Sequence, residues 1–235
     1  MAEVDEHLAA MVQETVRALL QEAQQTPRQV LAVARSAFLW SEQAIRLLEA
    51  SQPLPQPIVC EPGCHFCCYN QVEMTPPEAL LIADYIRRHW EVEERQALLA
   101  RLAQNLRHKQ GKNKAEIARM QPRLACPLLI HGLCAAYPVR PMVCRAMHSL
   151  DRRACETAFA NPRLLAMPHY DHRHTLSRSV AQGVLRGCQA AHCQAGTLDI
   201  DVALSDVLHH PSPAETWVMG GIVFPSLAGA KRVSH

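Results

Sequence analysis

Apolar residues recur every three or four positions through most of this chain, which is the spacing of an amphipathic helix. Alanine and leucine are abundant, glycine is scarce at nine residues, and few stretches alternate apolar and polar residues as a strand would. We therefore expect a mainly α fold. In the first helix, which should stop near Gln25, the expected inward positions are Val4, Leu8, Met11, Thr15 and Leu19.

A second helix is expected from Thr26, which can cap it, with Pro27 at its first position, to about Glu49. The tight break between the two helices predicts an antiparallel hairpin over residues 1–50. Residues 51–59 carry three prolines, cannot be helical and should form an extended linker. The inward positions of the second helix should be Val30, Val33 or Ala34, Phe38, Ile45 and Leu48.

A capping-box pattern predicts where the next helix begins. Glu78 follows Thr75 by three residues, so we expect one long helix from there, with apolar positions from Leu81 to Leu106. Residues 108–114, which are basic and contain a glycine, should be an exposed turn. Later helices are expected over 173–190, 199–209 and 213–219.

The region between Cys126 and Cys155 contains several prolines and should form short helices joined by tight turns. These elements divide the chain into four parts. They are a helical hairpin over 1–50, a linker over 51–59, a cysteine-rich domain over 60–160 and a C-terminal helical extension over 161–235 packed on that domain.

The composition is that of an ordinary globular protein, since 49% of the 235 residues are hydrophobic and 20% are charged. A net charge of only +2 gives no reason to expect nucleic acid as a partner. No apolar stretch is long enough to cross a membrane, and the acidic N-terminus is unlike a signal peptide. We therefore expect a cytoplasmic protein with reduced thiols. Its ten cysteines then point to metal binding or catalysis rather than to disulfides.

Eight of the cysteines form two groups that are candidate metal ligands. In the first group, gaps of three and two residues let thiolates converge on a tetrahedral metal, and Gly63 gives the turn its backbone freedom. The adjacent Cys67 and Cys68 leave three arrangements open: ligands of two metals, a bridge between metals, or one ligand beside a buried thiol. The candidates are Cys60, Cys64, Cys67, Cys68, Cys126, Cys134, Cys144 and Cys155.

The strings CEPGCHFCC, CPLLIHGLC and AYPVRPMVCR resemble the YkgJ-type cysteine-cluster family, also called the CxxCxxCC family or zinc- or iron-chelating domain. The block from Cys134 to Arg145 matches the family pattern Cys-x-x-Tyr-x-x-Arg-Pro-x-x-Cys-Arg in full. The resemblance covers roughly residues 60–156. The first gap is three residues where two are commoner, which leaves the role of Cys60 open.

The resemblance implies an iron- or zinc-binding domain, and one branch of the family is associated with lysine N-methylation of flagellin. If the chain is an enzyme, the resemblance implies iron–sulfur-dependent modification of a protein or peptide. Eight thiolates suit two zinc ions, two clusters, or one cluster with spare redox thiols, and soft thiolates do not choose between the metals. A structural-zinc interaction module and a metal-handling protein are the non-enzymatic alternatives.

Charge compensation predicts residues around such a site. Two divalent ions held by eight thiolates would carry a formal charge of about −4, which is costly to bury alone. Arg140, Arg145, Arg152 and Arg153 can neutralise that charge or donate to sulfur, unless they are ordinary surface residues. Tyr137 is a further candidate to shield the metal or hydrogen-bond to its ligands.

Two other groups carry weaker signals. The segment from His169 to His174 could be a metal or acid–base site, although His172 and His174 cannot share a helical face. Cys188 and Cys193 lie outside the resemblance and are equally well explained as thiols packed in the core. No glycine-rich nucleotide loop is present, so a conventional methyltransferase or dehydrogenase has no residues to support it.

Overall fold

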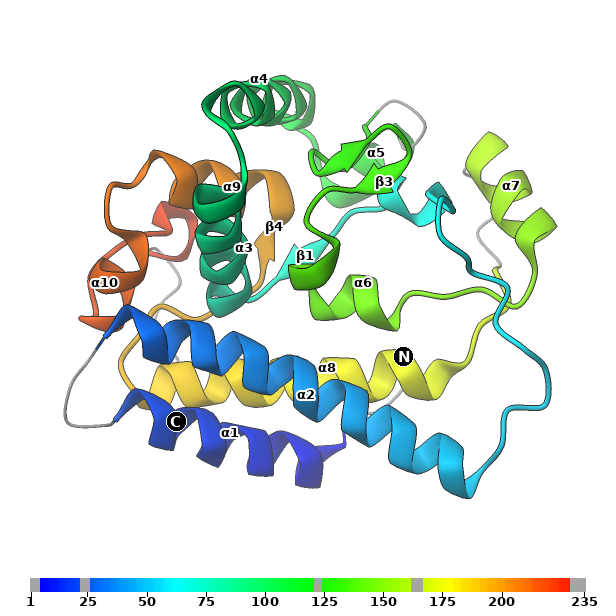
Figure 1. The fold of residues 1–235 in the computed structure, drawn as a ribbon, viewed down its shortest axis with the longest axis horizontal. Coiled ribbons are helices and arrows are strands. Elements are labelled where there is room, and N and C mark those ends of the chain that lie inside the picture. The colour runs from blue at the N-terminus through cyan, green and yellow to red at the C-terminus, as the bar shows by residue number, and fades with distance from the viewer. Residues whose placement is uncertain (1–4, 22–25, 121–123, 162–166, 229–235) are drawn as a thin grey trace.

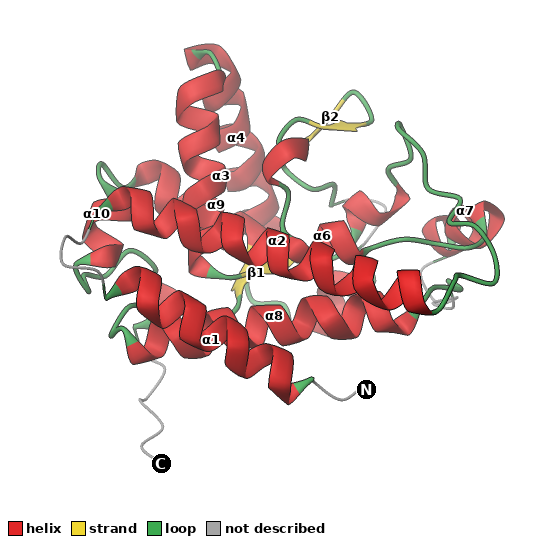
Figure 2. Cartoon of the chain, turned by 60° about the horizontal axis from the view of Figure 1, so that its bottom comes forward, coloured by secondary structure: helices red, strands yellow, loops and turns green. Residues whose placement is uncertain are grey.

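Helices make up most of the molecule, which confirms the mainly α fold expected from the sequence (Figures 1 and 2). The described strands are only two residues long and form two separate pairs. Among the residues described, no helix is both long and apolar enough to cross a membrane. The computed structural model describes residues 5–21, 26–120, 124–161 and 167–228.

Three long helices lie side by side and form one layer of the molecule (Figure 1). They are α1 (Glu6–Leu20), α2 (Pro27–Ser51) and α8 (Asp171–Ala190). The chain reverses direction between α1 and α2, while α8 packs against both of them. Because α8 also packs against α6 (Met142–Ala146), this layer contacts the cysteine-rich region.

Two glycines allow α8 to approach α1 closely. A Cβ atom at Gly183 would lie 2.5 Å from the carbonyl oxygen of Ala9, and one at Gly187 would lie 2.6 Å from Cβ of Val16. These distances are below normal contact, so only glycine fits while the two backbones stay where they are. The seam between the helices is therefore determined by residues more than 160 positions apart.

The inward face of α1 differs by about one position from the expected face. Met11 is 42% exposed, and Leu19 is only partly buried. The close approach of α8 rotates the buried stripe toward the seam, so a pattern counted along one helix misplaced it. The expected position Val4 and the expected end at Gln25 lie outside the described residues. The buried residues of α1 are Leu8, Ala9, Val12, Val16 and Leu20.

The start of α2 agrees with the sequence. Thr26 is the N-cap in an extended conformation, and Pro27 is the first helical residue. The expected inward residues of the first half are buried, whereas Ile45 and Leu48 near the C-terminal end are only partly buried. The fully buried members are Val30, Val33, Ala34 and Phe38.

The long helix expected after Thr75 is instead two helices, α3 (Pro76–His89) and α4 (Val92–Lys109). Trp90 is extended, and Glu91 begins α4 with a capping box of its own. Between Ile86 and Ala97 only Trp90 and Val92 are apolar, so the helical spacing is interrupted at this break. The second capping signal, Glu91 with a glutamate three residues later, was the available sign.

In the C-terminal part, the expected helices appear as α9 (Ile200–His209) and α10 (Pro213–Val218). Helix α9 packs on α3 and α4, and α10 packs on α2. Before α9, β4 (Leu198–Asp199) pairs antiparallel with β1 (Glu73–Met74), which leads into α3. This pairing brings the residues after the first cysteine group against the C-terminal helices.

The cysteine-rich region consists of short elements on one side of the molecule, as expected for residues 126–155 (Figure 1). A small β-hairpin there was not predicted. The division of the chain at residues 50, 60 and 160 stays a prediction. The elements are η1 (Phe66–Tyr69), α5 (Lys114–Ala118), β2 (Leu129–Ile130), β3 (Leu133–Cys134), η3 (Tyr137–Val139), α6 and α7 (Arg152–Ala160).

Candidate metal centre

The first cysteine group lies in a tight turn that runs into η1. The N–H of Cys64 donates to the carbonyl of Glu61 at 3.0 Å, and Gly63 in this turn has a left-handed φ of 87°. After η1 begins, the carbonyl of Cys68 accepts a hydrogen bond of 2.7 Å from the N–H of Cys126. This bond joins the first group to the second.

A hairpin presents Cys134. Leu129 in β2 lies opposite Cys134 in β3, and the two strands run antiparallel. Between the strands, His131 and Gly132 have φ values of 50° and 77°, which match the two left-handed residues of a tight hairpin turn. The strands are too short to show alternation, so the His-Gly pair was the sequence signal for this hairpin.

The loop before Cys144 is held by Arg145. Its Nε donates to the carbonyl of Arg140 at 2.9 Å, and its Nη2 donates to the carbonyl of Pro138 at 2.6 Å. Its Nη1 lies 2.7 Å from a carboxylate oxygen of Glu42 in α2. Through these contacts Arg145 holds the conformation of the loop and attaches the loop to α2.

Arg140 instead acts on the thiols through its charge. Its guanidinium carbon lies 3.7 Å from the ring centroid of Tyr137, and its Nη1 donates to the carbonyl of Tyr137 at 3.1 Å. Burial raises the pKa of Cys134 and of Cys144, and the charge of Arg140 opposes both rises. The side chain of Tyr137 is 59% exposed, and its ring contacts Arg140. The expected role of Tyr137 in shielding a metal stays a prediction.

Aromatic packing brings Cys155 to the first group. Cys155 is buried in α7, one helical turn before Phe159. The ring of Phe159 lies 4.8 Å from that of Tyr69 and 5.6 Å from that of Phe66, measured between centroids. Since both partners belong to η1, this contact fixes α7 beside the adjacent cysteines of η1.

Cys60 is attached to the segment between α6 and α7. The N–H of Ser149 donates to Sγ of Cys60 at 3.3 Å, and the carbonyl of Ser149 accepts from the N–H of Val59 at 3.1 Å. Cys60 is exposed, in contrast to the buried Cys155. These two bonds hold Cys60 beside the segment that leads into α7, which carries Cys155.

One set of thiols, which we call the first thiol set, consists of Cys60, Cys64 and Cys155. Burial raises the pKa of Cys60, and the neighbouring Cys64, Cys67 and Cys155 raise it further. Burial likewise raises the pKa of Cys155, to which Cys64 and Cys67 add. These effects indicate that Cys64 and Cys67 lie within electrostatic range of both Cys60 and Cys155.

The second thiol set consists of Cys126, Cys134 and Cys144. Burial raises the pKa of Cys126, and Cys144 and Cys134 add to the rise. Burial raises the pKa of Cys144 to about 12, helped by Cys67 and Cys134. A hydrogen bond with Cys68, followed by burial, raises the pKa of Cys67. Cys67 therefore acts on both thiol sets.

The donor chemistry of this region fits a metal that prefers thiolates. A thiol with a raised pKa stays protonated until a cation stabilises the thiolate, which a bound metal does. Within the described ranges, no three cysteine, histidine or acidic side chains already converge closely enough to hold one ion. Ligation would require the cysteine side chains to turn toward a common point, so the ligand set stays a prediction.

An orphaned donor beside Cys126 supports the presence of negative charge there. Arg101 in α4 donates from Nε to the carbonyl of Pro127 at 2.9 Å, while its Nη2 is buried and finds no acceptor in the described part of the chain. Burial lowers the pKa of Arg101, and Cys126 opposes that change. An orphaned buried donor costs about 1–3 kcal/mol, and a Cys126 thiolate would provide an acceptor. Arg101 was not a sequence candidate because it lies far along the chain from every cysteine.

The remaining candidate arginines are on the surface. Arg152 and Arg153 are both exposed. Arg152 forms ion pairs with Glu61 and Glu156, of which the first connects α7 to the turn of the first cysteine group. Their exposure therefore agrees with the alternative that Arg152 and Arg153 are surface residues and do not compensate sulfur charge.

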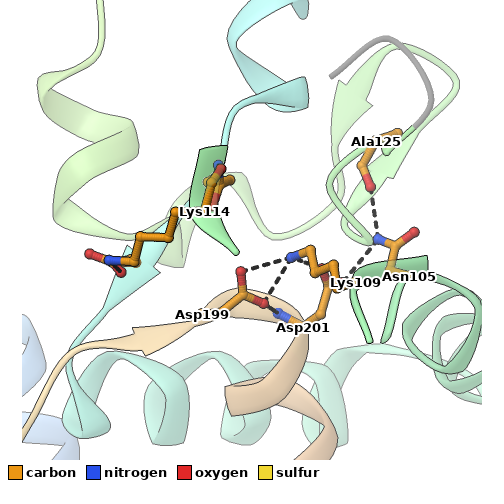
Figure 3. Close-up of polar contacts among 8 residues, drawn as sticks. Asn105, Lys109, Lys114, Ala125, Asp199 and Asp201 are labelled. Carbon is orange, nitrogen blue, oxygen red and sulfur yellow. Dashed lines mark hydrogen bonds and ion pairs between the residues drawn. The ribbon is translucent and has the colours of Figure 1, made fainter. Parts of the chain in front are cut away.

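A buried ion-pair network lies beside Cys126 (Figure 3). Nζ of Lys109 lies 2.7 Å from Asp199 and 2.5 Å from Asp201, and Nδ2 of Asn105 donates to Oδ1 of Asp201 at 2.9 Å. Nδ2 of Asn105 also donates at 3.0 Å to the carbonyl of Ala125, the residue before Cys126. The network thus fixes the second cysteine group to α4 and α9.

This network corrects the expectation that all of residues 108–114 are exposed. The side chain of Lys109 is only 13% exposed, because two carboxylates from the C-terminal part cover it. Lys114, at the other end of the turn, is exposed and pairs with Glu73 at 2.5 Å. A cavity of about 20 Å³, room for about one water molecule, lies between Lys109 and Cys126.

Three histidines meet where the chain enters α8. The ring centroid of His174 lies 4.9 Å from that of His169 and 5.8 Å from that of His148. His148 was not among the residues singled out from the sequence. Nδ1 of His148 donates to the carbonyl of Ala146 at 2.7 Å, and its Nε2 accepts from the N–H of Tyr170 at 2.8 Å. Nε2 therefore joins two chain segments, while Nδ1 bonds within its own segment. We call these three residues the histidine joint.

The rest of the segment after His169 fastens α8 to α2. Nε2 of His172 lies 2.8 Å from Glu49, and Arg173 makes two contacts of 2.6 and 2.7 Å with the same carboxylate. His172 and His174 thus face different partners, in agreement with their spacing. These contacts give the segment a structural role, while a metal or acid–base role stays a prediction.

The last two cysteines are buried in the main core. Cys188 in α8 is fully buried, and Cys193 is 7% exposed. The N–H of Cys193 donates to the carbonyl of Cys188 at 3.0 Å, which closes the turn after α8. Their packing against the core supports the interpretation of both residues as core thiols.

Comparison with known proteins yields one match. A family model described as "Putative zinc- or iron-chelating domain", named CxxCxxCC, matches residues 59–164. No curated protein and no solved structure matches the chain. The matched segment contains all eight candidate ligands and excludes Cys188 and Cys193. The model therefore matches the family that the cysteine motifs of this chain resemble, over residues 59–164.

Proposed function

We propose that this protein binds iron or zinc through two neighbouring thiolate centres. The first centre is formed by the first thiol set with Cys67, and the second by the second thiol set with Cys68. The adjacency of Cys67 and Cys68 then links the two centres. The observation that carries the proposal is that eight cysteines come from several short elements of one region, where neighbouring thiols raise the pKa values of Cys60, Cys144 and Cys155.

The charges around the thiols support this arrangement. Arg101 has an unused buried donor near the second centre, and Arg140 opposes the rise in pKa at two of its thiols. Positive groups in these places compensate the negative charge that metal-bound thiolates carry. Modification of a protein or peptide enters only through the family resemblance, so we propose metal binding and no reaction.

The metal and its stoichiometry can be measured directly. The protein is purified without oxygen, its metal content is determined, and its visible absorption is recorded. Two zinc ions in a colourless protein support two closed zinc centres, whereas absorption that dithionite bleaches supports iron–sulfur clusters. A protein that binds neither metal when both are supplied contradicts the proposal.

Single substitutions test the ligand assignment. Cys144→Ser is expected to lower the bound metal by about one ion per chain, because a tetrahedral centre loses one of its four ligands. Cys188→Ser is the matched control, since it removes a thiol that lies in the core outside the matched domain. Loss of metal in the control and full metal in Cys144→Ser would overturn the assignment.

The exposure of Cys60 favours a second candidate function, the transfer of metal to another protein. An exposed ligand can be reached by a competing thiol, whereas a closed structural site cannot. Metal in the first centre should then pass to a small-molecule chelator faster than metal in the second. Equal and slow release from both centres would favour a purely structural role.

A further inference from the structure

A buried glutamate connects the helix after the first cysteine group to the helix that carries Cys144. Glu78 lies in α3 and is only 2% exposed. Although its side chain is buried, it has no ion-pair partner within 4 Å in the described ranges. Oε2 accepts from the N–H and the hydroxyl of Thr75, at 2.7 and 2.8 Å. Oε1 accepts from the N–H of Met142, the first residue of α6, at 2.7 Å.

The first pair of contacts is an ordinary capping box, but the third is not. A capping box needs one acceptor directed at the N-cap of its own helix. The second oxygen of Glu78 reaches a residue 64 positions later, two residues before Cys144. The five-residue helix α6 has no side-chain cap of its own, so this oxygen supplies the acceptor for its first N–H.

The charge of Glu78 also distinguishes it from a simple structural contact. Burying a carboxylate costs free energy unless hydrogen-bond donors surround it. Three donors face Glu78, namely the N–H and hydroxyl of Thr75 and the N–H of Met142. A glutamine here would have one acceptor oxygen, and its NH₂ group would face a donor. Burial raises the pKa of Glu78, while the hydrogen bonds from Met142 and Thr75 and the charge of Arg145, on the same helix as Cys144, oppose that rise. The site is therefore built for an acceptor with two oxygens.

We propose that Glu78 is a positioning residue for the second centre, holding the start of α6 so that Cys144 faces the other thiols. This inference rests on the proposed function, because it assumes that Cys144 is a ligand. It assigns to the capping-box glutamate a role beyond helix capping. Such outer residues typically contribute about 10–100-fold to metal affinity.

The experiment measures the binding of Co²⁺ to the full chain after removal of its native metal. The intensity of thiolate-to-cobalt absorption reports how many thiolates bind, and competition with a chelator gives the affinity. Glu78→Gln is expected to weaken binding about 10–100-fold and to lower the absorption toward that of Cys144→Ser. In the double variant Glu78→Gln/Cys144→Ser, the affinity should equal that of Cys144→Ser, because Glu78 acts through this ligand.

Two control variants separate positioning from capping. Glu94→Gln alters the equivalent glutamate of the α4 capping box, which accepts from the N–H of Glu91 at 2.8 Å and is exposed. Thr75→Ala weakens only the contacts of Glu78 within its own helix. Both controls should leave the cobalt spectrum unchanged. If Thr75→Ala reproduces the effect of Glu78→Gln, the role of Glu78 is capping and the inference is wrong.

The remaining outcomes are also decisive. Wild-type affinity in Glu78→Gln overturns the inference, as does an additive loss in the double variant. If Cys144→Ser itself binds Co²⁺ like the wild type, the proposed function fails at this ligand instead. Should Glu78→Gln not fold, Met142→Pro replaces it, since proline deletes the N–H that Oε1 accepts at a helix position where proline is tolerated.

Discussion

At the scale of single residues, the cysteine motif combines two kinds of arginine. Arg145 uses its donors on backbone carbonyls and Glu42, and its guanidinium carbon lies 4.1 Å from the ring centroid of Phe38. Arg140 instead faces Tyr137 and acts on the thiols. The contacts of the two arginines therefore differ, while the expectation that both compensate sulfur charge stays a prediction.

Substitution by methionine should distinguish these roles. Arg140→Met and Arg101→Met are expected to weaken metal binding about 10-fold or more, because each removes a positive charge or donor near thiolates. Arg145→Met should mainly lower the free energy of unfolding, since it removes the donors that hold two backbone carbonyls of the loop and the ion pair with Glu42. Metal affinity and urea unfolding are measured for each variant. The reverse result, with Arg145→Met weakening metal binding most, would contradict this division.

At the scale of elements, the close packing of α1 on α8 depends on two small residues. Gly183→Ala would place Cβ 2.5 Å from a backbone oxygen and 2.7 Å from Cβ of Val12. Overpacking of this kind costs about 1–3 kcal/mol, against a gain of about 1 kcal/mol from helix propensity. We expect a net loss of stability in urea unfolding. Gln189→Ala, exposed on the same helix, is the control and should not destabilise the protein.

A stabilising effect of Gly183→Ala would mean that the two helices separate easily. The same outcome would show that the seam is not the constraint that rotates the buried face of α1. The close approach of α8 would then not account for the exposure of Met11.

The histidine joint predicts a loss of stability in acid. Burial lowers the pKa of His174 to about 4, and its neighbours His169, His148 and Arg178 lower it further while Asp171 opposes them. The folded state then favours neutral His174, whereas the unfolded chain gains a proton near pH 6.5. This contribution to stability is complete above about pH 6.5 and is lost as the pH falls toward about 4.

His148 should act in the same direction. Burial lowers its pKa, and the charges of Arg173, His169 and His172 add to that effect. Protonation would also remove the acceptor for the N–H of Tyr170. Urea midpoints between pH 7.5 and 5 should fall less in His174→Gln than in the wild type. His108→Gln, an exposed histidine of α4, should keep the wild-type slope, and an equal slope in both variants would contradict the prediction.

At the scale of the whole molecule, the stable layer of long helices and the cysteine-rich region differ in how they are held. The layer buries a continuous apolar core. The cysteine-rich region has two-residue strands and no helix longer than α7 between residues 124 and 161. Regions with so little regular structure gain much of their stability from metal ligands.

Removal of metal by a chelator should therefore loosen one part of the molecule. We expect limited proteolysis to cut the metal-free protein within residues 59–70 and 126–151 first, while α1, α2 and α8 remain protected. The experiment compares cleavage sites with and without added metal. Identical protection in both states would mean that the metal does not hold these loops together. Cys188→Ser should behave as the wild type in both states.

The sequence by itself determined the elements and the candidate chemistry. Local signals sufficed for these: the capping residues Thr26 and Thr75, the helical spacing, and the cysteine motif from Cys134 to Arg145. Each depends on residues within one or two turns of the chain, which a count along the sequence can read. The break at Trp90 was missed although a local signal, the capping box of Glu91 with Glu94, marks it.

Only the tertiary structure decided which distant residues meet. Lys109 meets Asp199 and Asp201, Glu78 meets Met142, and Arg101 comes near Cys126, none of which local spacing could reveal. The physical reason is that a buried charge must find its partners through packing of separate helices, and no periodicity records that pairing. The ligand types were thus readable from the chain, while their supporting residues came from the fold.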